Sequence, residues 1–162
     1  MKIIFIQTGG TIDKDYPRTT KGYAFEICEP AVKRIIKKLN PSFEYEIISV
    51  LKKDSLDITD ADRVKIFKVC KKIKSDKIII THGTDTMLET AKILSSIKGK
   101  TIIITGSMRP EMFSNSDAPI NIGISIGAMN VLSKGVYIAM HGQVMAWDAC
   151  RRDLKTGKFI KK

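Results

Sequence analysis

Lys77-Ile78-Ile79-Ile80-Thr81 leads directly into His82-Gly83-Thr84-Asp85-Thr86-Met87, and this stretch decides the fold. Its isoleucines form a short β-branched run of the kind that is buried on both faces of a parallel sheet. Residues 84–97 are predicted to form a helix. Working outward, Thr101–Thr105 is a second run of this kind, residues 118–133 have a helical pattern, and residues 136–140 are the last clear strand.

The same alternation is present upstream, where residues 2–7 and 44–50 are predicted strands and residues 30–39 a predicted helix. Strands and helices that alternate at this spacing indicate βαβ units. We therefore expect one α/β domain over residues 1–162. Its single sheet should be doubly wound and mostly parallel, of the Rossmann or flavodoxin type, with helices on both faces. Residues 142–162 are expected to form a loose C-terminal tail.

Thr59 is predicted to cap a further helix, with Asp62 three residues later. The spacing of its apolar residues predicts an inner side that consists of Val64, Phe67, Cys70 and Ile73.

Composition limits the class of protein. The chain has 162 residues and a formal net charge of +11, but its lysines are spread along the sequence and few aromatic residues lie among them. Nucleic-acid binding is therefore not the favoured interpretation. The three cysteines are odd in number and match no metal-binding spacing, so we expect no metal. No apolar run approaches the ~20 residues of a membrane helix, and we expect a cytoplasmic protein.

The strand ends are where an open parallel sheet places its site. The first strand ends in Thr8-Gly9-Gly10-Thr11-Ile12, whose paired glycines let the backbone turn sharply and approach a ligand. The third glycine of a dinucleotide-binding fingerprint is missing, and no Gly-Lys-Ser/Thr of a phosphate-binding loop follows. The loop does present a hydroxyl, Thr11, which becomes a nucleophile if a neighbour takes its proton.

The loop after residue 81 adds Thr84 and Asp85, for which simple helix capping is the alternative interpretation. His82 alone is more typical of a structural hydrogen-bonding residue than of a base. The next loop contains Arg109, either as a clamp or as an exposed arginine, and runs on to Asp117. A nucleophilic hydroxyl, a second hydroxyl and a carboxylate at one sheet edge are the ingredients of acyl transfer.

These loops resemble those of a known family. Thr8-Gly9-Gly10-Thr11-Ile12 is similar to the first asparaginase signature, and His82-Gly83-Thr84-Asp85-Thr86-Met87 to the second. Thr105-Gly106-Ser107-Met108-Arg109-Pro110 resembles a further stretch of that family. The likeness covers nearly the whole chain but only the family's N-terminal domain, and we expect the smaller C-terminal domain to be absent. The resemblance implies hydrolysis of L-asparagine, and by extension L-glutamine, to the acid and ammonia.

The resemblance also implies roles for individual residues. Thr11 would be the nucleophile that forms an acyl-enzyme, activated by Tyr23 in a mobile lid, with Tyr16 in reserve. Thr84 would activate water or polarise the amide. Asp85 would bind the substrate α-amino group and pair with a basic residue. The remaining substrate contacts would come from Ser55, which would bind the α-carboxylate, and from the backbone of Gly10.

The sequence departs from the family at two positions. Arg152 stands at the place of the family's catalytic lysine, and Leu56 at the place of a glutamine. Arginine can hold Asp85 but does not release a proton near neutral pH, and Lys155 is the nearest substitute in sequence.

The favoured hypothesis is an asparaginase-like amidohydrolase that needs no cofactor and acts as a homo-oligomer on an amino-acid amide. One alternative is a catalytically weakened amino-acid-binding or regulatory module. The other is the ammonia-releasing subunit of an amidotransferase complex.

Overall fold

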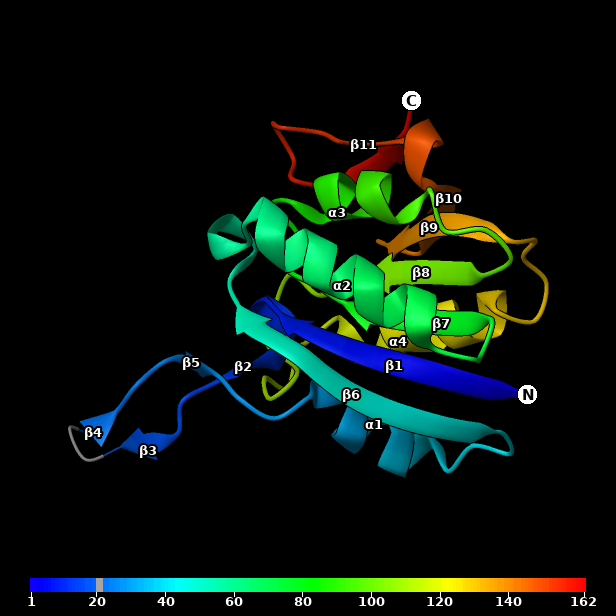
Figure 1. Ribbon diagram of the computed structural model, residues 1–162. Helices are drawn as coiled ribbons and strands as arrows, with labels where there is room; N and C mark the ends of the chain where they lie inside the picture. Colours follow the sequence, from blue (N-terminus) through cyan, green and yellow to red (C-terminus); the bar gives the residue numbers. More distant parts are fainter. Residues whose placement is uncertain (20–21) are drawn as a thin grey trace.

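A six-stranded sheet is the centre of the computed structural model, which describes residues 1–19 and 22–162 (Figure 1). The strand order is β10-β9-β8-β7-β1-β6. All neighbouring pairs are parallel except β9 and β10, which are antiparallel. The strands are β1 (Lys2–Gly9), β6 (Glu44–Lys53), β7 (Lys77–Thr81), β8 (Thr101–Thr105), β9 (Gly135–Met140) and β10 (Gln143–Ala146).

Helices cover both faces of this sheet, as the sequence predicts. α1 (Ala31–Leu39) and α4 (Ala118–Ala128) pack on one face, and α2 (Asp60–Lys72) and α3 (Met87–Leu94) on the other. The isoleucine run of β7 serves both layers: Ile79 belongs to the core under α1 and α4, while Ile78 and Ile80 belong to the core under α2 and α3. Side chains alternate across a strand, so a run buried on both faces has to be apolar throughout.

Two of the helices are shorter than predicted. α3 begins at Met87 rather than at residue 84, because residues 84–86 form a turn at the end of β7, and it ends at Leu94. α4 ends at Ala128, after which the chain turns toward β9.

The helix that follows Thr59 has the expected cap but a different inner face. Thr59 and Asp62 form a reciprocal capping box. The buried residues of α2 are Arg63, Ile66 and Cys70, whereas Val64 is 43% exposed. The prediction for Val64 was therefore wrong: the buried stripe contains Ile66, and Val64 lies outside it.

An arm leaves the body after β1. β2 (Lys14–Asp15) pairs with β5 (Glu26–Ile27), and β3 (Arg18–Thr19) pairs with β4 (Gly22–Tyr23). Figure 1 shows β3 and β4 at the far end of this arm, away from the sheet. The base of the arm is tied down where Lys14 Nζ contacts Asp54 Oδ2 at 2.7 Å.

The C-terminal segment is folded onto the body, which corrects the expectation that residues 142–162 are a loose tail. β10 joins the sheet, and β11 (Cys150–Arg152) pairs with β12 (Phe159–Lys161). Cys150 and Phe159 are each 1% exposed and belong to the core on the α2 and α3 side. These apolar side chains close the end of that core, which is why the segment packs despite its lysines.

Short 3-10 turns follow several strands: η1 (Thr11–Asp13), η2 (Ser55–Asp57) and η3 (Trp147–Ala149). The first two follow β1 and β6 and form part of the candidate site.

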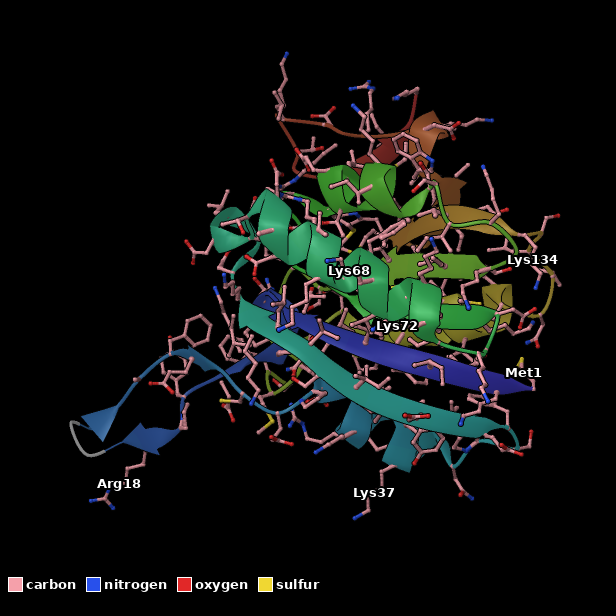
Figure 2. The ribbon with its side chains drawn as sticks, viewed as in Figure 1. Met1, Arg18, Lys37, Lys68, Lys72 and Lys134 are labelled. Carbon is pink, nitrogen blue, oxygen red and sulfur yellow. The ribbon has the colours of Figure 1, made fainter. Side chains whose placement is uncertain are left out.

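The basic side chains lie on several surfaces. Figure 2 shows Lys37 on α1, Lys68 and Lys72 on α2, and Lys134 before β9. Within the described residues, no helix is both long and apolar enough to span a bilayer.

If residues 150–161 are part of the domain, truncating Phe159 should unfold it more easily. We expect Phe159→Ala to lower the free energy of unfolding by ~3–5 kcal/mol, because a large buried side chain is removed. Leu154→Ala is the matched control, since Leu154 is 96% exposed on the same hairpin. Urea unfolding of both variants measures the difference. Equal stabilities would show that the segment does not contribute to the core.

Candidate active site

Glycines bring three strand-end loops into direct backbone contact. Gly10, after β1, has φ +86°, and a Cβ atom there would overlap the backbone of Gly83 after β7. A Cβ atom on Gly83 would in turn lie 2.6 Å from Cβ and Oγ of Ser55, after β6. Real side chains do not tolerate such approaches, so only glycine fits at either position. Thr11 and Thr84, the residues that follow these two glycines, are therefore placed at the same sheet edge.

The hydroxyls of Thr11 and Thr84 are not used by the scaffold. Both residues are partly exposed, and within the described part of the chain neither side chain makes a hydrogen bond. Neighbouring threonines behave differently. Their hydroxyls donate to backbone carbonyls: Thr8 to Thr81 at 2.8 Å, Thr86 to Ser55 at 2.7 Å and Thr105 to Ala139 at 2.7 Å. Thr11 and Thr84 are thus free to contact a ligand.

Asp85 is held from two sides. Arg152 Nη1 donates to its Oδ1 at 2.5 Å, and Ser55 Oγ lies 3.4 Å from its Oδ2. The Asp85 side chain is 41% exposed and that of Arg152 25%. The pairing of Arg152 with Asp85 that the sequence suggested is present, across 67 positions of chain. The carboxylate keeps an exposed side that can accept a hydrogen bond from an ammonium group.

Helix capping does not account for the pair at 84 and 85. The N-cap of α3 is Thr86, and it has no side-chain capping bond. The carboxylate of Asp85 contacts Ser55 and Arg152 instead.

Ser55 lies at the site, but its side chain is completely buried. Its hydroxyl accepts a hydrogen bond from the backbone N–H of Asp85 at 3.2 Å. In this arrangement Ser55 orients Asp85 and presents no surface to a substrate carboxylate. Its neighbour Leu56 is 73% exposed.

His82 has a structural role, as its sequence context suggested. It is fully buried, and burial lowers its pKa to about 4, opposed by its hydrogen bond with Gly83. Nδ1 lies 2.7 Å from the Gly83 carbonyl, which can only accept, so Nδ1 carries the proton. Nε2 then accepts from Thr90 Oγ1 at 2.8 Å. A neutral imidazole with both nitrogens engaged braces the loop.

The loop after β8 is shaped by Asp117 rather than by Arg109. The Asp117 carboxylate accepts from the backbone N–H groups of Met108 and Arg109 at 3.0 and 3.1 Å, and from Asn121 Nδ2 at 2.9 Å. Arg109 is exposed and forms no ion pair with the residues that the structure describes. The clamp interpretation of Arg109 is not what the structure shows.

The candidate activating residues come from the arm and from the C-terminal hairpin. Tyr23 is in β4, at the end of the arm, and its side chain is outside the described part of the structure. Tyr16 is 52% exposed and stacks on Phe25 at 4.6 Å between ring centroids. Lys155 is exposed in the turn between β11 and β12.

Asp13 is a further residue of the loop after β1 that the sequence motifs did not single out. It is fully buried, and its Oδ1 accepts from the backbone N–H of Ala31 at 2.8 Å, which ties the loop to the start of α1. Oδ2 has no hydrogen-bond partner among the described residues. Burial raises the pKa of Asp13 to about 6, opposed by the Ala31 hydrogen bond. The sequence shows an acid directly after Thr11-Ile12, but nothing nearby in the sequence indicates its contact with Ala31.

Glycine substitutions test the loop contacts. Gly83→Ala should destabilise the protein by ~1–3 kcal/mol, because its methyl group would overlap Ser55. Gly123→Ala is the control: it lies on an exposed face of α4 with open space around it, and it should be neutral or stabilise by up to ~1 kcal/mol. Thermal unfolding compares the two. A neutral Gly83→Ala would show that the loops are not in contact.

The raised pKa of Asp13 gives a stability that depends on pH. The folded state binds the Asp13 proton more tightly than the unfolded state does. The stability that this proton contributes is therefore complete below about pH 4 and is lost as the pH rises through about 6. Asp13→Asn should therefore stabilise the protein by ~2–3 kcal/mol at about pH 8 and by much less at about pH 4. Urea unfolding across this range tests it, with the exposed Asp148→Asn as control. A stability difference independent of pH would contradict the assignment.

Comparison with known proteins is consistent across sequence and structure. A family model described as Asparaginase, N-terminal matches residues 2–155. The glutaminase-asparaginase of Acinetobacter glutaminasificans is 30% identical over 156 residues, covering 89% of this chain and 47% of that protein. The structure of the thermostable L-asparaginase from Thermococcus kodakarensis superimposes with a TM-score of 0.82 at 27% identity, covering 99% of this chain and 51% of that chain.

A different kind of relative matches a shorter segment. One component of the glutamyl-tRNA(Gln) amidotransferase of Methanococcus vannielii is 42% identical over 72 residues, covering 43% of this chain and 17% of that protein. The chain spans about half the length of the curated asparaginases it matches over most of its own length.

Proposed function

Since this chain belongs to the asparaginase family, matching its N-terminal domain, we propose that it hydrolyses the side-chain amide of L-asparagine, and of L-glutamine as a second substrate, to the acid and ammonia. One observation carries the proposal. The backbone contact of Gly10 with Gly83 places two unused hydroxyls, Thr11 and Thr84, at one sheet edge beside the partly exposed carboxylate of Asp85.

The proposed chemistry proceeds in two steps. Thr11 Oγ1 attacks the amide carbon, the hydroxyl proton passes to the leaving nitrogen, and the C–N bond breaks to release ammonia and leave an ester on Thr11. Water that is activated at Thr84 then cleaves this ester and restores the hydroxyl. Asp85 binds the substrate α-amino group, and the approach of the Gly10 backbone limits the space for the substrate.

Arg152 takes a positioning role in this scheme. An arginine keeps its charge and its proton at all physiological pH values, so it fixes the Asp85 carboxylate without acting as a base. The base for Thr11 is then Tyr23, delivered when the arm folds over the site. This proposal is supported by the place of Tyr23 on a segment joined to the body at Lys14 and Asp54.

We also propose that the chain self-associates. Ile120 and Val131 are 64% and 83% exposed on and just after α4, a helix without charged residues. A second copy that covers these two side chains would remove them from water.

Two alternative functions are each favoured by one observation. The 72-residue likeness to an amidotransferase component favours a role as the ammonia-releasing part of a larger assembly. Arg152, at the position of a family lysine, favours an amino-acid-binding module in which turnover is weak. Binding of L-aspartate that raises the melting temperature, without ammonia release from L-asparagine, would select the binding module.

Substitution of Thr11 separates catalysis from folding. Purified protein should release ammonia from L-asparagine, and Thr11→Ala should lower kcat by at least ~10³-fold because the nucleophile is gone. Its stability should change by less than ~0.5 kcal/mol, since the hydroxyl makes no scaffold bond.

Thr8→Ala is the matched control for that experiment. It removes a buried hydroxyl that donates to Thr81, and should cost ~1–3 kcal/mol of stability while the folded fraction keeps its activity. Ammonia release by Thr11→Ala at the wild-type rate would exclude the threonine mechanism.

A further inference from the structure

His141 occupies a backbone conformation that few side chains adopt. It is the first residue of the two-residue turn between β9 and β10, with φ 54°, and Gly142 follows with φ 79°. Positive φ at both positions is typical of the tight hairpin turn that fits strand twist, for which Asn-Gly is the preferred sequence. The positive φ restricts this position to residues that tolerate it, such as asparagine or histidine. Asparagine would suit the turn equally well, so the turn alone gives no reason for an imidazole ring.

The ring makes a contact of its own. Nδ1 of His141 accepts a hydrogen bond from the backbone N–H of Phe159 at 3.2 Å. The imidazole also stacks on the Phe159 ring, with centroids 6.1 Å apart and an angle of 26° between the planes. The turn between β9 and β10 thus holds β12 through one side chain.

Phe159 connects this contact to the candidate site. It is the direct cross-strand partner of Arg152 in the β11–β12 pair. Arg152 Nε donates to the Gly157 carbonyl at 3.2 Å, and Nη1 donates to Asp85. The turn between β11 and β12 is closed by Asp153, whose carboxylate accepts hydrogen bonds from the N–H groups of Lys155 and Thr156. The position of β12 therefore sets the position of the arginine that holds Asp85.

We infer that His141 is a positioning residue, whose neutral ring fixes Phe159 and through it the Arg152–Asp85 pair, and that protonation of Nδ1 releases this hold. The catalytic consequence rests on the function proposed above, whereas the structural consequence does not. A protonated Nδ1 is a donor and cannot accept from an N–H group. The same proton places a cation near Arg152, which carries another.

The charges around the ring set the direction of the effect. Burial lowers the pKa of His141, Asp117 from the loop after β8 raises it, and Lys158 of the turn and Arg152 of β11 lower it. The folded state therefore binds the proton less readily than the unfolded state. The hydrogen bond from the Phe159 N–H to His141 is therefore intact at neutral and higher pH, and it is lost as the pH falls below the ordinary histidine range near 6.5.

Two variants of His141 separate the acceptor from the turn. In His141→Asn the side-chain oxygen replaces Nδ1 as acceptor, tolerates positive φ and does not titrate. In His141→Gly the turn is retained and the acceptor is lost. Because Asp13 and His82 are present in every variant, their titration is common to all three proteins.

The experiment follows amide exchange at Phe159, whose N–H donates to His141, by NMR from about pH 8 to about pH 5, after correction for the intrinsic pH dependence of exchange. We expect wild-type protection to fall by about five- to tenfold toward acid pH, which is the effect of one lost hydrogen bond. His141→Asn should stay protected at both ends, and His141→Gly should be exposed throughout. Acid sensitivity of His141→Asn equal to that of wild type, or full protection in His141→Gly, would overturn the inference.

Ammonia release provides the functional readout on the same proteins. His141→Gly should raise KM for L-asparagine more than it lowers kcat, since Asp85 binds the amino group, and His141→Asn should restore KM. Unchanged KM in His141→Gly would overturn the catalytic part of the inference. If the wild-type protein releases no ammonia, the proposed function fails, and the amide protection still decides the role of His141.

Discussion

The site depends on the close approach of loop backbones where β1, β6 and β7 end. Gly10 lies against Gly83, and Gly83 against Ser55, with no room for a Cβ atom at either glycine. This contact brings residues more than seventy positions apart in the chain to one sheet edge, and it does so with main chain rather than with flexible side chains. The hydroxyls that follow the glycines are therefore positioned by the rigid sheet, as the proposed catalytic role would require.

Electrostatics adds a second constraint to this frame. Asp85 is exposed enough to contact a charged ligand, yet its position is fixed by hydrogen bonds with Ser55 and Arg152. A lysine in the place of Arg152 would be a compact charge whose pKa shifts readily, whereas arginine offers a rigid fork that never loses its proton. Arginine in place of lysine therefore favours the orientation of Asp85 over proton transfer by residue 152. In the proposed reaction, proton transfer would then fall to the hydroxyl pair and to the arm.

Sequence patterns predicted the features that depend on local chemistry. The isoleucine runs of β7 and β8 predicted a sheet buried on both faces, and the Thr59–Asp62 pair predicted a helix start. The pairing of Arg152 with Asp85 was suggested by the family resemblance and not by a local pattern. Features that depend on distant packing were not predictable. Val64 faces outward because the buried stripe of α2 runs through Ile66. Phe159 is buried because it packs against the end of the core on the α2 and α3 side, which its sequence neighbours do not indicate. Asp13 accepts a hydrogen bond from the first N–H group of α1, eighteen positions away, a contact that no local pattern predicts.

A crystal structure with L-aspartate, the product of the proposed reaction, would show whether Thr11, Thr84 and Asp85 form one binding site. We expect the side-chain carboxylate of the ligand to lie between the hydroxyls of Thr11 and Thr84 and its ammonium group to contact Asp85. Arg152 should remain paired with the carboxylate of Asp85. Aspartate bound away from the Gly10–Gly83 contact, or bound there with Arg152 turned from Asp85 to the ligand, would contradict this expectation.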